Sequence, residues 1–386
     1  MSSIIEYLES EFATFDEKPF GAVDAAVLSQ AAMLNGTGIV PSFPSAPSGL
    51  LDRLSAFLAP QLPSARFVDF ARAERFDGMF TGLVPHDIKR CLFALIASPR
   101  FRDLAICGFQ RVVDEAACTQ FMATTYVWRD AFAFVAFGGT DISLAGWREN
   151  LDMAYCPETG AQRLARTYLE QAASHLPQRL LVGGHSKGGN LALYAALTCR
   201  DTVRGRIDHL WALDAPGFKE GCFTEEDYAR LGDRASRIVP EESTIGMLLE
   251  CPLEPMVVRS TASGVEQHSA FTWEIEGGAF VSAGRLSDSS RALRDVTAEW
   301  LSGMDDARRR RVVEAVSEAV VASGATDVLD VLAPGQDVIG NMIEVSQRLD
   351  ADTRDTLARA LGDLANIAMR RLGEDVVQSL PWLRRQ

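Results

Sequence analysis

Hydrophobic and polar positions divide the chain into three parts, of which the first hundred residues form the first. Short stretches of helical character are interrupted there by residues 36–50, GTGIVPSFPSAPSGL. Prolines and glycines at this density sustain neither a helix nor a strand. We therefore predict short helices joined by a loop over this part of the chain.

The residue composition changes after Phe101, where β-branched and aromatic residues dominate. Three strands are predicted there, over LAICGFQRVV, TQFMATTYVW and AFAFVAF. Only Arg129 and Asp130 separate the last two segments, and so short a connection indicates a hairpin. We expect this hairpin to lead into the centre of a sheet.

Beyond the hairpin, segments typical of strands alternate with segments typical of helices. The predicted helices cover about residues 161–175, 187–199 and 225–231. The predicted strands between and after them are RLLVGG, IDHLWALD, SRIVP and EPMVVRS. Alternation at these lengths is typical of a mostly parallel sheet with crossover helices. The predicted fold class is therefore α/β.

The strand pattern stops at about residue 285. Apolar residues then recur at spacings of three and four in SSRALRDVTAEWLSGM, DDARRRRVVEAVSEAVVAS and ADTRDTLARALGDLANIAMRRLG. That spacing predicts amphipathic helices, whose apolar stripes must be buried. No long linker precedes them, so we expect this tail to pack on its own chain. The predicted units are residues 1–284, with N-terminal helices to about 100 and a sheet core over 101–284, and a helical segment over 285–386.

A run of arginines over residues 308–311 offers a nucleic-acid site as one interpretation. The adjacent Asp305 and Asp306 and the helical spacing favour a solvated helix face instead. The formal net charge of -14 also opposes binding to nucleic-acid phosphates and to anionic membrane surfaces. We expect no nucleic-acid partner.

The composition predicts the number of domains, the state of the cysteines and the location of the protein. The 386 residues, 47% hydrophobic and 23% charged, suffice for one large or two modest domains. The 7 cysteines are scattered without a C-x-x-C pair or histidines at metal-ligand spacing, which favours reduced thiols. Acidic residues near the N-terminus argue against a secretory signal, and no window reaches the roughly 18 apolar residues of a membrane span. We expect a soluble, cytoplasmic protein without an integral membrane segment.

The candidate chemistry centres on residues 180–197, LLVGGHSKGGNLALYAAL, in which Ser186 lies between Gly184 and Gly188. Mainly apolar, strand-like residues precede this G-x-S-x-G pattern, and a helical segment follows it. In such a strand–turn–helix, small residues two positions before and after the serine let the helix pack closely and expose the hydroxyl. An ordinary glycine-rich turn is the alternative. The context favours Ser186 as a catalytic nucleophile in a nucleophile elbow.

A serine nucleophile needs a base to accept its proton. The chain offers His86, His175, His185, His209 and His268. His268 lies in VEQHSAFTWEI, after the last predicted parallel strand. The α/β-hydrolase chain order of serine, then acid, then histidine favours His268 as the base over a plain surface-loop histidine.

The acid of the predicted triad has more than one candidate. Asp214 follows a predicted strand in WALDAPGF, while Glu241 and Glu242 follow the next strand in RIVPEES. All three belong to the edge of the sheet where ligands bind. A buried carboxylate that orients the base should have apolar and tight-turn neighbours, which favours Asp214 and keeps Glu242 as the alternative.

An oxyanion hole needs two donors. The backbone N–H of Lys187 follows the serine directly and is the first candidate, while we expect its ammonium to face solvent. Thr140, in the AFGGTD segment of residues 136–141, is the second, through its backbone N–H and its hydroxyl. An ordinary glycine turn is the alternative at this segment.

These segments together resemble a known family. AFGGTD, GWRENLDMAY, GGHSKGGNLALYAA, LDAPGF, VPEESTIGMLLE and QHSAFTWEI look like a bacterial domain family of unknown function related to the class-three, fungal-type lipases. The resemblance spans about residues 4–275, with its specific motifs over 136–273. It implies an α/β-hydrolase-like fold and places the family's oxyanion residue at Thr140, its serine at Ser186 and its histidine at His268.

The resemblance departs from the lipase pattern at two positions. Gly138 stands where those lipases usually carry an arginine, and Ser243 lies near the position of their aspartate. Pancreatic-type lipases carry their acid one strand earlier, in a G-L-D-P-A segment to which ALDAPGF is similar. That similarity supports Asp214.

The leading hypothesis is a serine hydrolase that cleaves an ester or thioester through an acyl-enzyme. Its substrate would be a small acyl ester, lipid-like through the resemblance, and no metal or organic cofactor is implied. A catalytically silent binding or scaffold protein with the same fold is one alternative, and an acyltransferase is another. The sequence gives neither the acyl length nor the oligomeric state.

Overall fold

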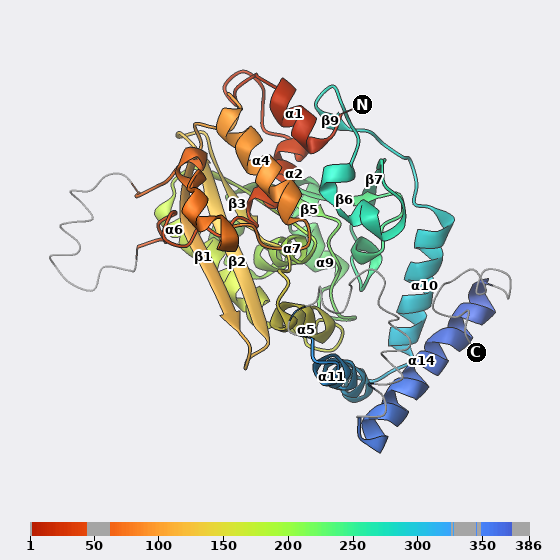
Figure 1. Cartoon of the computed structure of the whole chain (residues 1–386). Coiled ribbons are helices and arrows are strands. Elements are labelled where there is room, and N and C mark those ends of the chain that lie inside the picture. Colours follow the sequence, from red (N-terminus) through yellow and green to blue (C-terminus); the bar gives the residue numbers. More distant parts are fainter. Residues whose placement is uncertain (1, 45–61, 326, 328–344, 346–348, 373–386) are drawn as a thin grey trace.

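The computed structural model describes residues 2–44, 62–325, 327, 345 and 349–372 (Figure 1). Its N-terminal part consists of the helices α1 (Ile4–Ser10), α2 (Ala22–Ala31) and α4 (Pro85–Ala97), with short 3-10 turns η1 (Phe67–Phe70) and η2 (Ala73–Gly78). Residues 36–44 of the predicted loop contain no helix or strand, and residues 45–50 lie outside the described residues. The prediction of short helices here is confirmed.

A seven-stranded sheet forms the centre of the molecule. In spatial order the strands are β1 (Ala105–Asp114), β2 (Thr119–Trp128), β3 (Phe132–Phe137), β4 (Arg179–His185), β5 (Ile207–Leu213), β6 (Ala235–Pro240) and β7 (Pro255–Val258). The pairs β1–β2 and β2–β3 are antiparallel, and β3 to β7 are parallel. The mostly parallel sheet and the hairpin leading into its centre are as predicted.

Helices cover both faces of this sheet (Figure 1). Phe134 and Ala136 of β3 pack with α1, α2 and α4 on one face, while the alternate residues Val135 and Phe137 pack with α6 (Gly160–His175) and α7 (Lys187–Thr198) on the other. Strands buried on both faces consist of nearly continuous apolar residues, as β3 does. Three shorter helices complete this part of the chain: α5 (Leu144–Asp152), α8 (Asp201–Arg204) and α9 (Glu225–Ala229).

A buried ion pair fixes the N-terminal helices to the rest of the chain. The guanidinium of Arg100 donates to both carboxylate oxygens of Asp24 at 2.7 Å, and the hydroxyl of Tyr7 donates to the same carboxylate at 2.8 Å. Burial raises the pKa of Tyr7, followed in effect by the charge of Asp24. The three side chains therefore join α1, α2 and the segment after α4 at one buried point.

The tail contains the helices α10 (Asp288–Ser302), α11 (Asp306–Ala322) and α14 (Ala351–Leu372). Its packing on its own chain is confirmed for α10 and α11, since Oγ of Ser290 in α10 donates to the carbonyl of Ser243 at 2.5 Å and Lys219 forms an ion pair with Asp306 of α11 at 2.6 Å. The solvated face expected for residues 308–311 is wrong at Arg309, whose buried guanidinium donates to the carbonyls of Leu301 and Ala154. Arg309 thus joins α11 to the end of α10 and to the segment just after α5.

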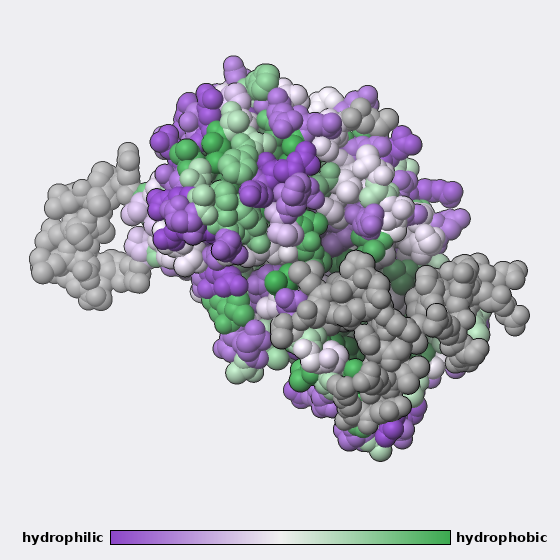
Figure 2. Space-filling model, viewed as in Figure 1, coloured by the Kyte–Doolittle hydropathy of each residue, from purple (hydrophilic) through white to green (hydrophobic). Residues whose placement is uncertain are grey.

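The surface mixes polar and apolar side chains, and apolar ones gather over the part formed by helix α4 (Figure 2). Phe93 of α4 and Leu83, just before that helix, are exposed by 46% and 43%. Among the described residues, no helix combines the length and the apolarity that crossing a membrane requires.

Two glycines allow the close approach of α7 to the strands beneath it. A Cβ on Gly184 would lie 2.2 Å from the carbonyl carbon of Gly188, and a Cβ on Gly188 would lie 2.1 Å from the carbonyl oxygen of Phe137. Both contacts are with backbone, so no side chain can rotate away to make room. Any larger residue must push helix α7 off the sheet.

Gly184→Ala should therefore lower the free energy of unfolding by about 3 kcal/mol, because an added methyl group forces the backbone apart. Gly362→Ala on α14 is the matched control, since a Cβ there meets nothing within 4 Å. That control should be neutral or stabilising, by up to about 1 kcal/mol. Urea unfolding curves measure both, and equal stabilities of the two variants would contradict the close packing.

Candidate active site

Ser186 occupies a strained turn between β4 and α7. Its backbone has φ 58° and ψ -130°, a combination that residues with a side chain rarely adopt, and its N–H donates to the carbonyl of Leu213 at 2.8 Å. The side chain is partly exposed although the residues on either side of the turn are largely buried. The predicted strand–turn–helix is thus present, with the serine at its tip.

His268 and Asp214, the predicted base and acid, form a hydrogen bond to each other. Nδ1 of His268 lies 2.6 Å from Oδ2 of Asp214, which follows β5 and is fully buried. A carboxylate only accepts, so Nδ1 carries the proton and Nε2 remains free to accept another. His268 ends the short turn η5 (Gly264–His268), 54 residues beyond its partner.

The alternative acid, Glu242, is used elsewhere in the same region. Its carboxylate accepts from the backbone N–H of Gly264 at 2.5 Å and from Nε2 of Gln267 at 3.1 Å. These bonds hold both ends of η5 rather than the imidazole of His268. Of the three acids weighed from the sequence, Asp214 is therefore the one that the structure brings to the base.

A second histidine, His185, forms a hydrogen bond to the backbone of His268. Nε2 of His185, the residue before Ser186, lies 2.7 Å from the backbone carbonyl oxygen of His268, and the two ring centroids are 4.7 Å apart. Burial lowers the pKa of His185 from 6.5 to about 3, with a smaller effect from the neighbouring His268. The ring of His185 is therefore neutral at physiological pH, and its Nε2–H donates to the carbonyl. This contact places His268 directly beside the turn that carries Ser186.

Thr140 lies in the loop after β3, which contacts the same turn. A Cβ on Gly139 would lie 3.7 Å from the Cβ of Ser186, so the loop approaches the serine closely. The hydroxyl oxygen of Thr140 accepts from Nδ2 of Asn150 at 2.8 Å, which leaves the hydroxyl hydrogen available to donate. The N–H of Lys187, the first residue of α7, has no acceptor within the helix, and the loop that carries Thr140 approaches Ser186 at Gly139.

The expectation that the ammonium of Lys187 faces solvent is wrong. The side chain is 1% exposed, forms an ion pair with Glu149 of α5 and donates to the carbonyl of Gln120 at 2.7 Å. The carboxylate of Glu149 also accepts from the N–H groups of Gln120 and Ala161, at 3.0 and 2.7 Å. Burial lowers the pKa of Lys187, against the opposing effect of Glu149.

The ion pair between Lys187 and Glu149 joins helix α7, which follows Ser186, to helix α5, which follows the loop of Thr140. Removing either partner would leave an uncompensated buried charge, which typically costs about 3–5 kcal/mol. Glu149 precedes Asn150, the residue that holds the hydroxyl of Thr140. The pair therefore fixes α7 and α5, and with them the two candidate oxyanion donors, relative to each other.

Sequence reasoning missed these supporting residues. Glu149, Asn150 and the side chain of Lys187 carry no local pattern of their own, and Ser243 donates to Asp214 across 29 residues of sequence. Of these supporting residues, His185 alone had a signal in the sequence, since it directly precedes the predicted nucleophile.

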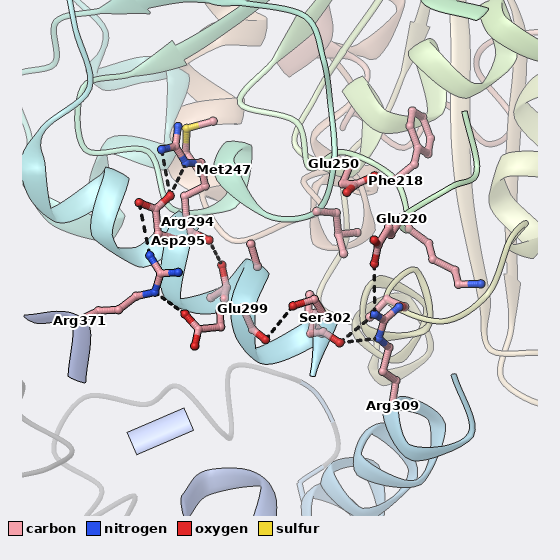
Figure 3. A pocket seen from close by; sticks show the side chains of 16 residues that line it. Phe218, Glu220, Met247, Glu250, Arg294, Asp295, Glu299, Ser302, Arg309 and Arg371 are labelled. Carbon is pink, nitrogen blue, oxygen red and sulfur yellow. Dashed lines mark hydrogen bonds and ion pairs between the residues drawn. The ribbon is translucent and has the colours of Figure 1, made fainter. Parts of the chain in front are cut away.

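A cavity of about 590 Å³ lies between the tail and the core (Figure 3). Its lining includes Met247 and Phe218 on the core side and Arg294, Glu299 and Arg309 on the tail. Ser186, His268 and Thr140 are not among the lining residues. The cavity is therefore separate from the candidate active site.

The mostly parallel sheet, the helices on both of its faces and the strand–turn–helix at Ser186 define an α/β-hydrolase-like fold with a helical C-terminal part. Residues 95–318 match the Mbeg1-like family. Because this match covers more than half of the chain, the protein belongs to that family. The matched residues continue past the predicted unit boundary at residue 284 and include all of α10.

Three solved lipase structures resemble the chain at low identity. A fungal lipase bound to an inhibitor is 19% identical, with a TM-score of 0.29, over 40% of this chain and 62% of that one. M37 lipase is 13% identical, with a TM-score of 0.31, over 57% and 73% of the two chains. The lipase of Rhizomucor miehei with its propeptide is 16% identical, with a TM-score of 0.32, over 68% and 82%.

The chain thus spans less than two thirds of the first of these lipases. No curated protein matches it. With TM-scores this low, the fold assignment rests on the sheet and on the family match.

His185 should make the stability of the protein sensitive to mild acid. Its pKa is about 3 in the folded chain and near 6.5 when unfolded, so between these values only the unfolded state binds the proton. The contribution to stability is full above pH 6.5 and is lost as the pH falls toward 3. From pH 7 to pH 5, His185 alone should cost about 2 kcal/mol.

His185→Gln keeps a donor for the carbonyl of His268 but does not titrate, and it should lack this loss. Urea unfolding of both proteins at pH 7 and pH 5 measures the difference, since the carboxylates titrate alike in each. An equal loss in the two proteins would show that His185 is not held neutral.

Proposed function

We propose that this protein is a serine hydrolase that cleaves an ester or thioester through an acyl-enzyme. The observation that carries the proposal is the hydrogen bond between His268 and the buried Asp214, beside a serine in a strained and partly exposed turn. A serine without a catalytic role needs neither an oriented imidazole nor a strained backbone conformation.

In the first half of the reaction, Oγ of Ser186 attacks the carbonyl carbon of the substrate and its proton passes to Nε2 of His268. Asp214 holds the imidazole in the tautomer that can accept this proton and stabilises the imidazolium. The oxyanion that forms is stabilised by the N–H of Lys187 and by the N–H or hydroxyl of Thr140. The tetrahedral intermediate then breaks its bond to the leaving oxygen or sulfur, which takes the proton from His268 and departs as an alcohol or thiol, and Ser186 remains acylated.

In the second half, water replaces the leaving group. Nε2 of His268 takes a proton from the water molecule while the oxygen of that water attacks the acyl carbon. The same two donors stabilise the second oxyanion. Collapse of this intermediate returns the proton to Oγ of Ser186 and releases the acid. No step requires a metal or an organic cofactor.

We extend the proposal to the substrate and the setting with two further expectations. The acyl group is lipid-like, in keeping with the lipase-like fold. The protein acts in the cytoplasm, where its free cysteines would stay reduced.

Ser186→Ala should abolish labelling by a fluorophosphonate probe, because only an activated serine reacts with it. Hydrolysis of a short p-nitrophenyl ester should fall by about 10⁴ to 10⁶ in turnover, the usual cost of losing the nucleophile. Ser174→Ala, at an exposed serine of α6, is the matched control and should label and turn over like the wild type. Undiminished hydrolysis by the Ser186→Ala protein, or no labelling of the wild type, would overturn the proposal.

The acid is tested by a pair of charge-removing substitutions. Asp214→Asn should lower kcat by about 10⁴, because the asparagine favours the wrong tautomer of His268. Glu242→Gln should have a mild effect, since its bonds to η5 are peripheral to the imidazole. Steady-state kinetics on the same ester compare the two variants, and the reverse ranking would assign the acid to Glu242.

A further inference from the structure

The tail helix α10 reaches the carboxylate of Asp214 through two serines. Oγ of Ser290 donates to the backbone carbonyl of Ser243 at 2.5 Å, and Oγ of Ser243 donates to Oδ1 of Asp214 at 2.5 Å. All three residues are at least 97% buried. Buried hydroxyl groups are rarely left without partners, and here each one donates toward the acid.

The loop that carries Ser243 is held on both sides. On the side of the acid, the N–H of Gly246 also donates to Oδ1 of Asp214, at 3.1 Å, and a Cβ on Gly246 would lie 2.2 Å from that oxygen. On the side of the tail, the N–H of Ser287 donates to the carbonyl of Glu241 at 2.8 Å. This clamped loop, which consists of residues 241–244 and the 3-10 turn η4 (Ile245–Met247), is therefore held between α10 and Asp214.

The two oxygens of Asp214 thus have different tasks. Oδ2 contacts His268, while Oδ1 accepts only from the clamped loop in the bonds described above. Because the carboxylate is rigid, fixing Oδ1 also fixes the direction in which Oδ2 points. Displacements of this kind, far from the reacting atoms, can lower turnover strongly.

We propose that Ser290 is a positioning residue of the hydrolase and that α10 belongs to its catalytic unit. Ser290 fixes the backbone of Ser243, and Ser243 fixes the carboxylate that orients His268. This inference rests on the function proposed above. The family match, which includes α10, agrees with a tail helix that is part of the working domain.

The experiment compares four variants of the full-length chain on a p-nitrophenyl ester: Ser243→Ala, Ser290→Ala, the double variant and the control Ser289→Ala. Ser289 is next to Ser290 but its hydroxyl bonds only to that of Ser287 among the contacts given by the structure. Ser243→Ala should lower kcat about tenfold, the effect of losing one hydrogen bond to a charged group, with KM little changed. Ser290→Ala should lower kcat about threefold to fivefold, and Ser289→Ala should not.

The double variant decides whether Ser290 acts through Ser243. If it does, the double variant should be no slower than Ser243→Ala alone, because residues in one network are not additive. A decrease equal to the product of the two single effects would overturn the proposal. So would wild-type kcat in Ser290→Ala, or a change confined to KM.

A second pair of substitutions separates positioning from plain packing. Threonine and valine have nearly the same shape and differ in the hydroxyl group, so Ser290→Thr and Ser290→Val disturb the packing of α10 alike. Ser290→Thr should keep most of the wild-type kcat, and Ser290→Val should match Ser290→Ala. Equal losses in both, with equal falls in melting temperature, would assign Ser290 a structural role only.

The fluorophosphonate probe keeps the two proposals apart. A wild type that labels and hydrolyses the ester, together with an unaffected Ser290→Ala protein, would overturn the positioning role alone. A wild type that neither labels nor hydrolyses would overturn the hydrolase, and the positioning role with it.

Discussion

The close approach of helix α7 to the sheet is the constraint on which the candidate site depends. Backbone meets backbone at Gly184 and Gly188, at distances that leave no room for a Cβ. The chain can pass from β4 into α7 over so short a path only by taking the positive φ observed at Ser186. The same close packing brings the loop after β3 against the serine, so the position of Thr140 follows from it. A helix packed at an ordinary distance would carry the serine away from that loop.

Buried polar contacts then hold the parts that this packing brings together. Lys187 and Glu149 join α7 to α5, His185 and His268 join the turn to η5, and Ser243 and Ser290 join Asp214 to the tail. The first and third contacts connect the candidate site with helices, α5 and α10, that carry none of its candidate residues, and the second connects the turn of Ser186 with the candidate base His268. A buried polar group is stable only with its partners in place, so these contacts specify one geometry where apolar packing alone would allow several.

Much of the fold was predictable from the sequence because it depends on local periodicity. Continuous apolar strands separated by helices of period 3.6 predicted the parallel sheet, and the two-residue connection at Arg129 and Asp130 predicted the hairpin. The errors concern single charged side chains. Lys187 and Arg309 look like surface residues in a linear sequence, yet both are buried against partners that their own helices do not supply.

The sequence by itself determined the order of strands and helices and the turn at Ser186, because hydrophobic period and glycine spacing act over a few residues. It also placed His268 and the candidate acids at the same edge of the sheet, because chain order and strand direction limit where a loop can lie. Only the tertiary structure decided which acid meets His268, where the ammonium of Lys187 lies and what α10 contacts. Those outcomes depend on atoms 38, 47 and 54 residues apart in the chain. Contacts over such separations are set by the packing of whole elements, which no short stretch of sequence encodes.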